Sequence, residues 1–200
     1  MRPAALGTVA LAAAGVAWSS SAAAGAGAAA QAAPAPAAAT DAHAARCSHT
    51  DAVASAEPEL AARAILCLLN RERERRGLAP LRRSPALAAA AAGHSRDMVR
   101  RRYFAHTAPG RVTFVRRIER ARYARGATAK LGENLAWGMG DPAAPSAVVR
   151  GWMHSPEHRA NILDPDFRAI GIGIAAGVPV ATASAAAATG ATYTTDFGSR

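Results

Sequence analysis

Apolar and polar positions in the first part of the chain follow the spacing of amphipathic helices. Between 57 and 76, Leu60, Ala64 and Leu68 recur every four residues, with glutamates early and arginines late, as the helix dipole favours. A second helix is predicted to begin at Ser84, an N-cap residue followed by proline. The predicted helices span about 57–76, 84–102, 113–123 and 144–153, and a short one begins at Ser155-Pro156.

The C-terminal part changes to the period of β-strands. From 168 to 175, Ile170, Ile172 and Ile174 alternate with small residues, so the isoleucines share one face. A second strand is predicted at 191–197, a short extended segment at 131–137, and a further strand candidate at 178–183. Helices followed by antiparallel strands predict an α+β fold in which helices pack on a sheet.

The N-terminal 45 residues differ from the rest in composition. A basic start, an apolar run and Ala-x-Ala sites predict a secretory signal peptide over 1–24, with an Ala-rich disordered tail as the alternative. The Ala/Pro-rich stretch 25–45 is predicted to be a disordered linker, and 46–200 a single domain. No later span of 18 apolar residues occurs, so no transmembrane segment is expected after the signal peptide.

The two cysteines, Cys47 and Cys67, are interpreted through the expected export. Outside the cytosol, two thiols in one small domain usually form a disulfide, and this pair would tie the start of the domain to the first helix. The alternative is two unpaired thiols, one of them inside the helix. Two cysteines alone cannot build a metal framework.

Positive charge is unevenly distributed along a chain of net charge +10. The segment from Arg71 to Lys130 holds 17 basic and four acidic residues, whereas the part after it holds four arginines and six acids. One half of the surface should therefore be basic. It is either a solvated helical face or a surface that attracts wall polymers or anionic lipid; no nucleic-acid motif occurs, and no nucleic-acid partner is expected.

Three residues could carry chemistry. His106 and His158 can exchange protons or bind a metal, and Glu133 can orient an imidazole or act as a base. Two histidines and a glutamate suffice for an open zinc site if they converge. Spacings of 27 and 25 residues do not show convergence, and scattered surface histidines are the alternative. His154 is not paired with His158, because proline between them begins a new helix.

An ordered set of short motifs supports a more specific interpretation. The motifs run in this order: Leu69-Asn70-Arg71-Glu72-Arg73, Gly77-Leu78, Leu81, His94-Ser95, Met98, Tyr103-Phe104-Ala105-His106, Gly132-Glu133-Asn134, Trp152-Met153, Ser155-Pro156, His158-Arg159, Asn161-Ile162-Leu163, Ile170-Gly171-Ile172-Gly173, Tyr193-Thr194 and Phe197-Gly198. Together they resemble the CAP superfamily, or SCP domain, which groups cysteine-rich secretory, antigen 5 and pathogenesis-related 1 proteins. The match is to its bacterial secreted branch.

The resemblance implies a three-layer α-β-α sandwich with a small antiparallel sheet, and a central cleft lined by His106 and Glu133. Many eukaryotic members hold two histidines and two glutamates there. Here Thr192 stands where the last histidine is expected, and the bacterial branch offers His158 instead. The resemblance therefore implies a three-member cleft of His106, Glu133 and His158. His106 and His158 would be the metal ligands and Zn²⁺ the candidate cofactor.

The resemblance leaves three function classes open for a protein expected to be secreted, extracellular or wall-associated. The first is a binding module for lipid, wall polymer or a divalent metal. The second is a metal-assisted, protease-like hydrolase that uses His106, His158 and Glu133. The third is a structural wall protein with a vestigial cleft. The sequence specifies neither the ligand nor the oligomeric state.

Overall fold

The computed structural model describes residues 47–123, 129–181 and 189–199. The predicted signal peptide (1–24) and linker (25–45) lie outside the described residues.

The predicted helices are all present, within a few residues of their expected bounds. They are α2 (Pro58–Glu74), α3 (Pro85–Arg101), α4 (Phe114–Arg120), α5 (Pro145–His154) and α6 (Pro156–Leu163), with the 3₁₀ turn η1 (Asp141–Ala143) before α5. Proline opens α2, α3, α5 and α6, where its missing N–H costs nothing. The Ser84 side chain caps α3 by accepting from Leu87 N. Ser155 occupies the predicted cap position of α6, but its hydroxyl contacts Glu157 instead of capping the helix.

In the described residues one sheet has the order β1-β3-β4-β2. Its strands are β1 (Arg82–Arg83), β2 (Leu131–Gly138), β3 (Ala169–Ala176) and β4 (Ala191–Gly198). The three long strands are antiparallel as predicted, and the two-residue β1 adds a parallel pair beside β3. Residues 178–181 of the strand candidate 178–183 form no strand, because the chain turns at Gly177 with a positive φ; the rest of that candidate lies outside the described residues.

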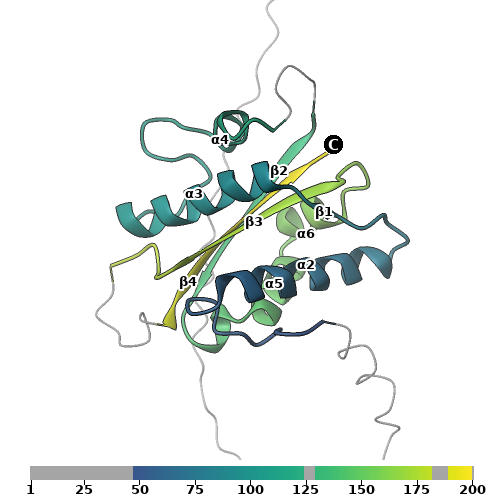
Figure 1. Ribbon diagram of the computed structural model, residues 1–200, viewed down its shortest axis with the longest axis horizontal. Coiled ribbons are helices and arrows are strands. Elements are labelled where there is room, and N and C mark those ends of the chain that lie inside the picture. Colours follow the sequence, from purple (N-terminus) through teal and green to yellow (C-terminus); the bar gives the residue numbers. More distant parts are fainter. Residues whose placement is uncertain (1–46, 124–128, 182–188, 200) are drawn as a thin grey trace, which may run out of the picture. The chain divides into compact units, whose positions relative to one another are not determined.

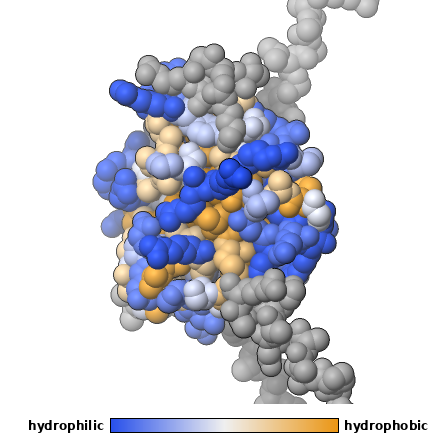
Figure 2. Space-filling view, turned by 45° about the vertical axis from the view of Figure 1, so that its right-hand side comes forward, coloured by the Kyte–Doolittle hydropathy of each residue, from blue (hydrophilic) through white to orange (hydrophobic). Residues whose placement is uncertain are grey.

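Helices cover both faces of the sheet, which confirms the α+β class with its α-β-α layers. Figure 1 shows α3 and α4 on one side and α2, α5 and α6 on the other. The larger core lies under α2, α5 and α6, where Ile65, Trp152, Tyr193 and Phe197 are buried. A smaller core joins α3, α4 and the sheet around Leu87 and Ile118. Long hydrophilic side chains lie across the apolar surface that remains visible in Figure 2.

Two glycines bring α3 directly onto the sheet. A Cβ at Gly171 would overlap the backbone of Leu87 and Ala88, and a Cβ at Gly173 would overlap that of Ala91 and Ala92. The alternation of isoleucine and glycine in β3 therefore matters on both faces of the sheet. Its isoleucines pack toward the larger core, while its glycines leave room for the helix backbone.

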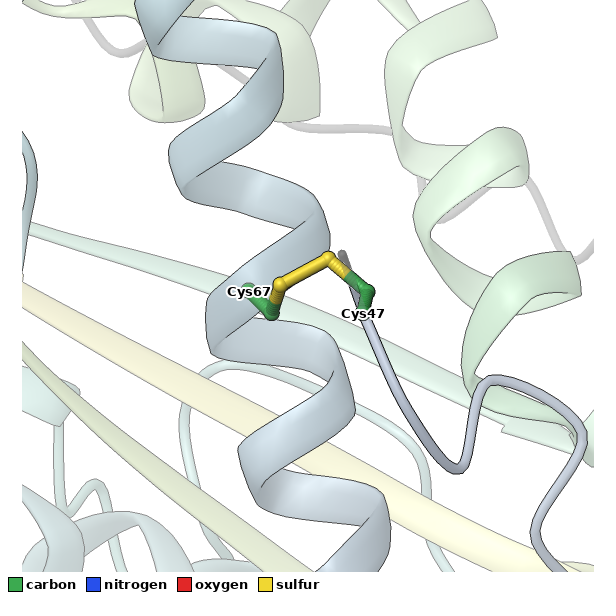
Figure 3. The surroundings of a disulfide bond; sticks show 2 residues. All are labelled: Cys47 and Cys67. Atoms are coloured by element: carbon green, nitrogen blue, oxygen red, sulfur yellow. A yellow bond between two sulfur atoms is a disulfide. The ribbon is translucent and has the colours of Figure 1, made fainter. Parts of the chain in front are cut away.

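The predicted disulfide is present. Cys47 and Cys67 are bonded, and this ties the start of the described chain to the middle of α2 (Figure 3). Bonds of this kind persist in oxidising compartments.

Arg73 is a fully buried cation that joins α2 to the end of α6. Its guanidinium donates to carbonyl oxygens of Ala79, Ile162, Asp164 and Phe167 at 2.8–3.0 Å. Because backbone carbonyls satisfy the donors, the charge is held inside the fold without a buried carboxylate.

No helix in the described part of the chain is both long enough and apolar enough to span a membrane.

Candidate functional site: a buried glutamate that orients His106

The site centres on a contact between His106 and Glu133. His106 lies in the loop between α3 and α4, and Glu133 lies on β2, facing the same side of the sheet. His106 Nδ1 is 2.8 Å from Glu133 Oε1. Only 1% of the Glu133 side chain is exposed, compared with 38% for His106. Because a carboxylate only accepts hydrogen bonds, Nδ1 carries the hydrogen, and Nε2 is the ring nitrogen that remains for other partners.

Arg117 of α4 holds the other carboxylate oxygen. Its Nη2 is 2.5 Å from Glu133 Oε2, while Nη1 donates to the carbonyls of His106 and Val112 at 2.9 and 3.1 Å. One guanidinium therefore fixes both the glutamate and the loop that carries the histidine. Arg117 was not among the site residues predicted from the sequence. One sequence feature could have indicated that Arg117 is partly buried: it directly precedes Ile118, the buried residue of α4, whereas the other arginines of this helix are exposed.

Asp196 completes the buried charge arrangement. It faces Glu133 across the β2–β4 pair, and neither of its buried carboxyl oxygens has a hydrogen-bond partner in the described structure. Burial, with the neighbouring Glu133 charge, raises the pKa of Asp196 well above its usual value. Asp196 therefore keeps its proton to a higher pH than an ordinary aspartate does.

His94 of α3 contacts the loop that carries His106. His94 Nε2 lies 3.0 Å from the carbonyl of Ala105, the residue before His106. Burial lowers the pKa of His94 to about 4, so its ring is neutral at physiological pH and donates to this carbonyl. The residue belongs to the family-like motifs, but its role in positioning the loop becomes visible only in the structure.

The third predicted site residue, His158, belongs to α6, on the opposite side of the sheet from α3 and α4. It lies in the first turn of α6, and its carbonyl accepts from Asn134 Nδ2 at 3.0 Å. Asn161 Nδ2 donates to Asn134 Oδ1 at 2.8 Å, which fastens α6 to β2. Burial lowers the pKa of His158, and the charge of His106 lowers it further, so the two imidazoles lie within electrostatic range of each other. The structure thus joins His106 directly to Glu133, whereas His158 contacts Asn134 through its backbone carbonyl.

The donors present are a poor fit to a zinc site. No group of three or more His, Cys, Asp or Glu residues among those described is arranged to hold a metal ion. Both oxygens of Glu133 are engaged by His106 and Arg117, and the guanidinium supplies the positive charge that a cation would otherwise bring. The assignment of His106 and His158 as metal ligands stays a prediction.

The fold and the ordered motifs define the class of protein. Residues 66–178 match the sequence model of the cysteine-rich secretory protein (CAP) family, and the chain belongs to this family. It is 37% identical over 106 residues to YkwD of Bacillus subtilis (strain 168), an alignment that covers 53% of this chain and 39% of YkwD. The chain thus matches less than half the length of this relative.

Solved structures show the same architecture. An extracellular protein with an SCP domain from Bacillus anthracis aligns over 70% of this chain and 43% of its own, with a TM-score of 0.52 and 28% identity. An outer surface protein of Borrelia burgdorferi aligns over 71% of this chain and 94% of its own, with a TM-score of 0.58 and 20% identity, and shows the fold alone.

Proposed function

We propose that this chain is an extracellular binding module whose ligand contacts the exposed edge of His106. The observation that carries the proposal is the 2.8 Å contact of His106 Nδ1 with buried Glu133, which holds a part-exposed imidazole in one orientation and one tautomer. Nε2 is the ring nitrogen left for a ligand, and a hydroxyl matches it because a hydroxyl both donates and accepts hydrogen bonds. Hydroxyls occur on wall polymers and on polar lipids, two of the three ligand classes that the family resemblance implies; the third is a divalent metal.

Two observations support an extracellular location. The Cys47–Cys67 bond is of the kind that persists in oxidising surroundings. The solved relatives are described as an extracellular protein and an outer surface protein. Both agree with the signal peptide that the sequence predicts at 1–24.

The binding experiment compares His106→Ala with His154→Ala. His154 is an exposed histidine on α5 outside the site, so its replacement removes an equivalent side chain without touching Glu133. Purified cell-wall polymer and neutral lipid vesicles are the two probes, used in sedimentation assays. Binding lost in His106→Ala and kept in His154→Ala supports the proposal and identifies the ligand class. Equal binding by both variants overturns it.

The alternative function is hydrolysis. An imidazole whose Nδ1–H is held by a carboxylate is also the arrangement of a general base. Peptide and ester substrates test this with Glu133→Gln, which keeps the shape of the side chain and removes its charge. Turnover that disappears in this variant would favour the enzyme over the binding module.

Zinc titration by calorimetry tests the metal prediction separately. Saturable binding near one equivalent that is lost in His106→Ala and in His158→Ala would show that both imidazoles ligate the ion. Binding that is absent, or unchanged in the variants, would remove the metal from the proposal and leave the hydrogen-bonding role of His106 untouched.

A further inference from the structure

We propose that the outer surface of the α3–α4 layer binds a linear anionic polymer through its arginines. The segment 96–122 is described in full and runs from the middle of α3 through the loop to the end of α4. Its exposed arginines are called the basic layer here: Arg96, Arg100, Arg101, Arg102, Arg111, Arg116, Arg120 and Arg122. This surface is distinct from the His106 site, and the proposal does not rest on the function proposed above.

The charge of this layer is not a general property of the fold. Residues 96–122 contain nine arginines and two acids, Asp97 and Glu119, and Asp97 already pairs with Arg100 and Arg101. On the opposite side of the sheet, α2 with its flanking residues (57–76), α5 and α6 contain seven arginines and five glutamates. Both layers come from the same arginine-rich sequence, so composition alone does not explain the difference between them.

Backbone geometry gives a second, independent argument. Three helices end in the same turn, in which an N–H bonds to the carbonyl five residues earlier: Leu78 to Arg73 in α2, Tyr103 to Met98 in α3, and Tyr123 to Ile118 in α4. The penultimate residue of this turn is left-handed and is usually glycine. In α2 it is Gly77, with φ +66°.

In the basic layer the same position is arginine. Arg102 has φ +54° and Arg122 has φ +68°, and Arg111, in the loop turn between Ala108 and Val112, has φ +61°. A residue with a Cβ is strained in this conformation. All three side chains are exposed, so packing in the core does not offset the strain. Residues in strained backbone conformations cluster at binding and active sites, and three of them lie in this one segment.

The extent of the layer suits a polymer better than a small anion. The arginines of α3 occupy its second half, where Arg96 to Arg102 correspond to about 9 Å of helix, and they continue through the loop and α4. The guanidinium group pairs with phosphate or carboxylate through two parallel hydrogen bonds. The exposed large hydrophobic residues of the described chain are Val53, Val115 and Val180, and only Val115 lies within residues 96–122. Insertion into a membrane would require more apolar side chains than this.

The test compares two triple variants of equal net charge. Arg102→Asn, Arg111→Asn and Arg122→Asn removes three charges from the basic layer, and asparagine tolerates the left-handed backbone. The control, Arg63→Gln, Arg150→Gln and Arg159→Gln, removes three exposed charges from α2, α5 and α6. The probes are linear polyphosphate and polyglutamate at low salt, which distinguish phosphate from carboxylate recognition. We expect the basic-layer variant to lose affinity about tenfold or more, with a shallower salt dependence, while the control stays near the parent protein.

Three results would overturn the proposal. Equal losses in both triple variants would show that net charge alone attracts the polymer. Tighter binding to phosphatidylglycerol vesicles than to either polymer would identify a membrane surface instead. A melting temperature that falls in Arg102→Gly or Arg122→Gly would show that these arginines stabilise the fold. The proposal expects a rise of about 2–4 °C for each.

Discussion

Asp196 and Glu133 lie side by side in the β2–β4 pair, and both face the layer of α3 and α4. One guanidinium, that of Arg117, is the cation next to them, and burial together with the Glu133 charge raises the pKa of Asp196 well above its usual value. This shared arrangement keeps Glu133 available as the acceptor for His106.

Asp196→Asn is expected to stabilise the protein at neutral pH. The pKa of Asp196 is higher in the folded protein than in the unfolded chain, where it is near 4. Its contribution to the free energy of unfolding is therefore complete below about pH 4. The contribution is lost as the pH rises through the pKa of the folded protein. Asparagine is neutral throughout, so the gain should grow by up to about 1.4 kcal/mol per pH unit above pH 4. Urea denaturation from pH 4 to 8 measures it, with exposed Asp141→Asn as the control. A constant loss at every pH would mean that ionised Asp196 is required.

His94 should produce the opposite pH dependence. Its folded pKa of about 4 lies below the unfolded value near 6.5, so stability falls as pH drops from 6.5 toward 4, by about 3 kcal/mol at most. His94→Gln keeps a donor for the Ala105 carbonyl and should flatten this part of the profile. An NMR titration of the His94 ring gives the direct measurement, and a midpoint above 6 would contradict the assignment.

Arg73→Leu should destabilise the protein by about 3 kcal/mol or more. The substitution fills the space but leaves buried carbonyls of α6 and its C-terminal turn without donors. Arg63→Leu on the exposed face of the same helix is the matched control and should change stability by less than about 0.5 kcal/mol. Denaturation midpoints that agree for the two variants would refute the importance of the buried contacts.

Gly173→Ala should lower the free energy of unfolding by about 3 kcal/mol or more, because the new Cβ would overlap the α3 backbone rather than a side chain that can move. Gly151→Ala in α5 is the contrasting change. It points into open space and should stabilise the helix by about 1 kcal/mol. Calorimetric melting of both variants checks the pair, and a harmless Gly173→Ala would show that α3 sits less closely than described.

Replacing Cys47 and Cys67 together with alanine should lower stability by about 3 kcal/mol, since the bond closes a segment of 20 residues. The parent protein should lose the same amount in reductant, whereas the double variant should not respond. A parent protein equally stable with and without reductant would argue against a structural role.

Periodic segments were predictable from the sequence, and contacts between distant segments were not. The helix predicted at 57–76 is observed at Pro58–Glu74 because propensity, charge placement and the following glycine agree. Arg117 and Asp196 could not be predicted, because they meet Glu133 only through the packing of α4 and the register of β2 with β4. Nothing in their separations along the chain reveals such neighbours, and His106 was placed near Glu133 by family resemblance, not by spacing.

Glu133 and Asn134 are adjacent in β2 and point to opposite faces of the sheet, one toward His106 and Arg117, the other toward α6 and the carbonyl of His158. Two adjacent residues of an edge strand therefore hold both helical layers through hydrogen bonds of their side chains. The contacts that both helical layers make at this end of the sheet thus depend on the position of one strand.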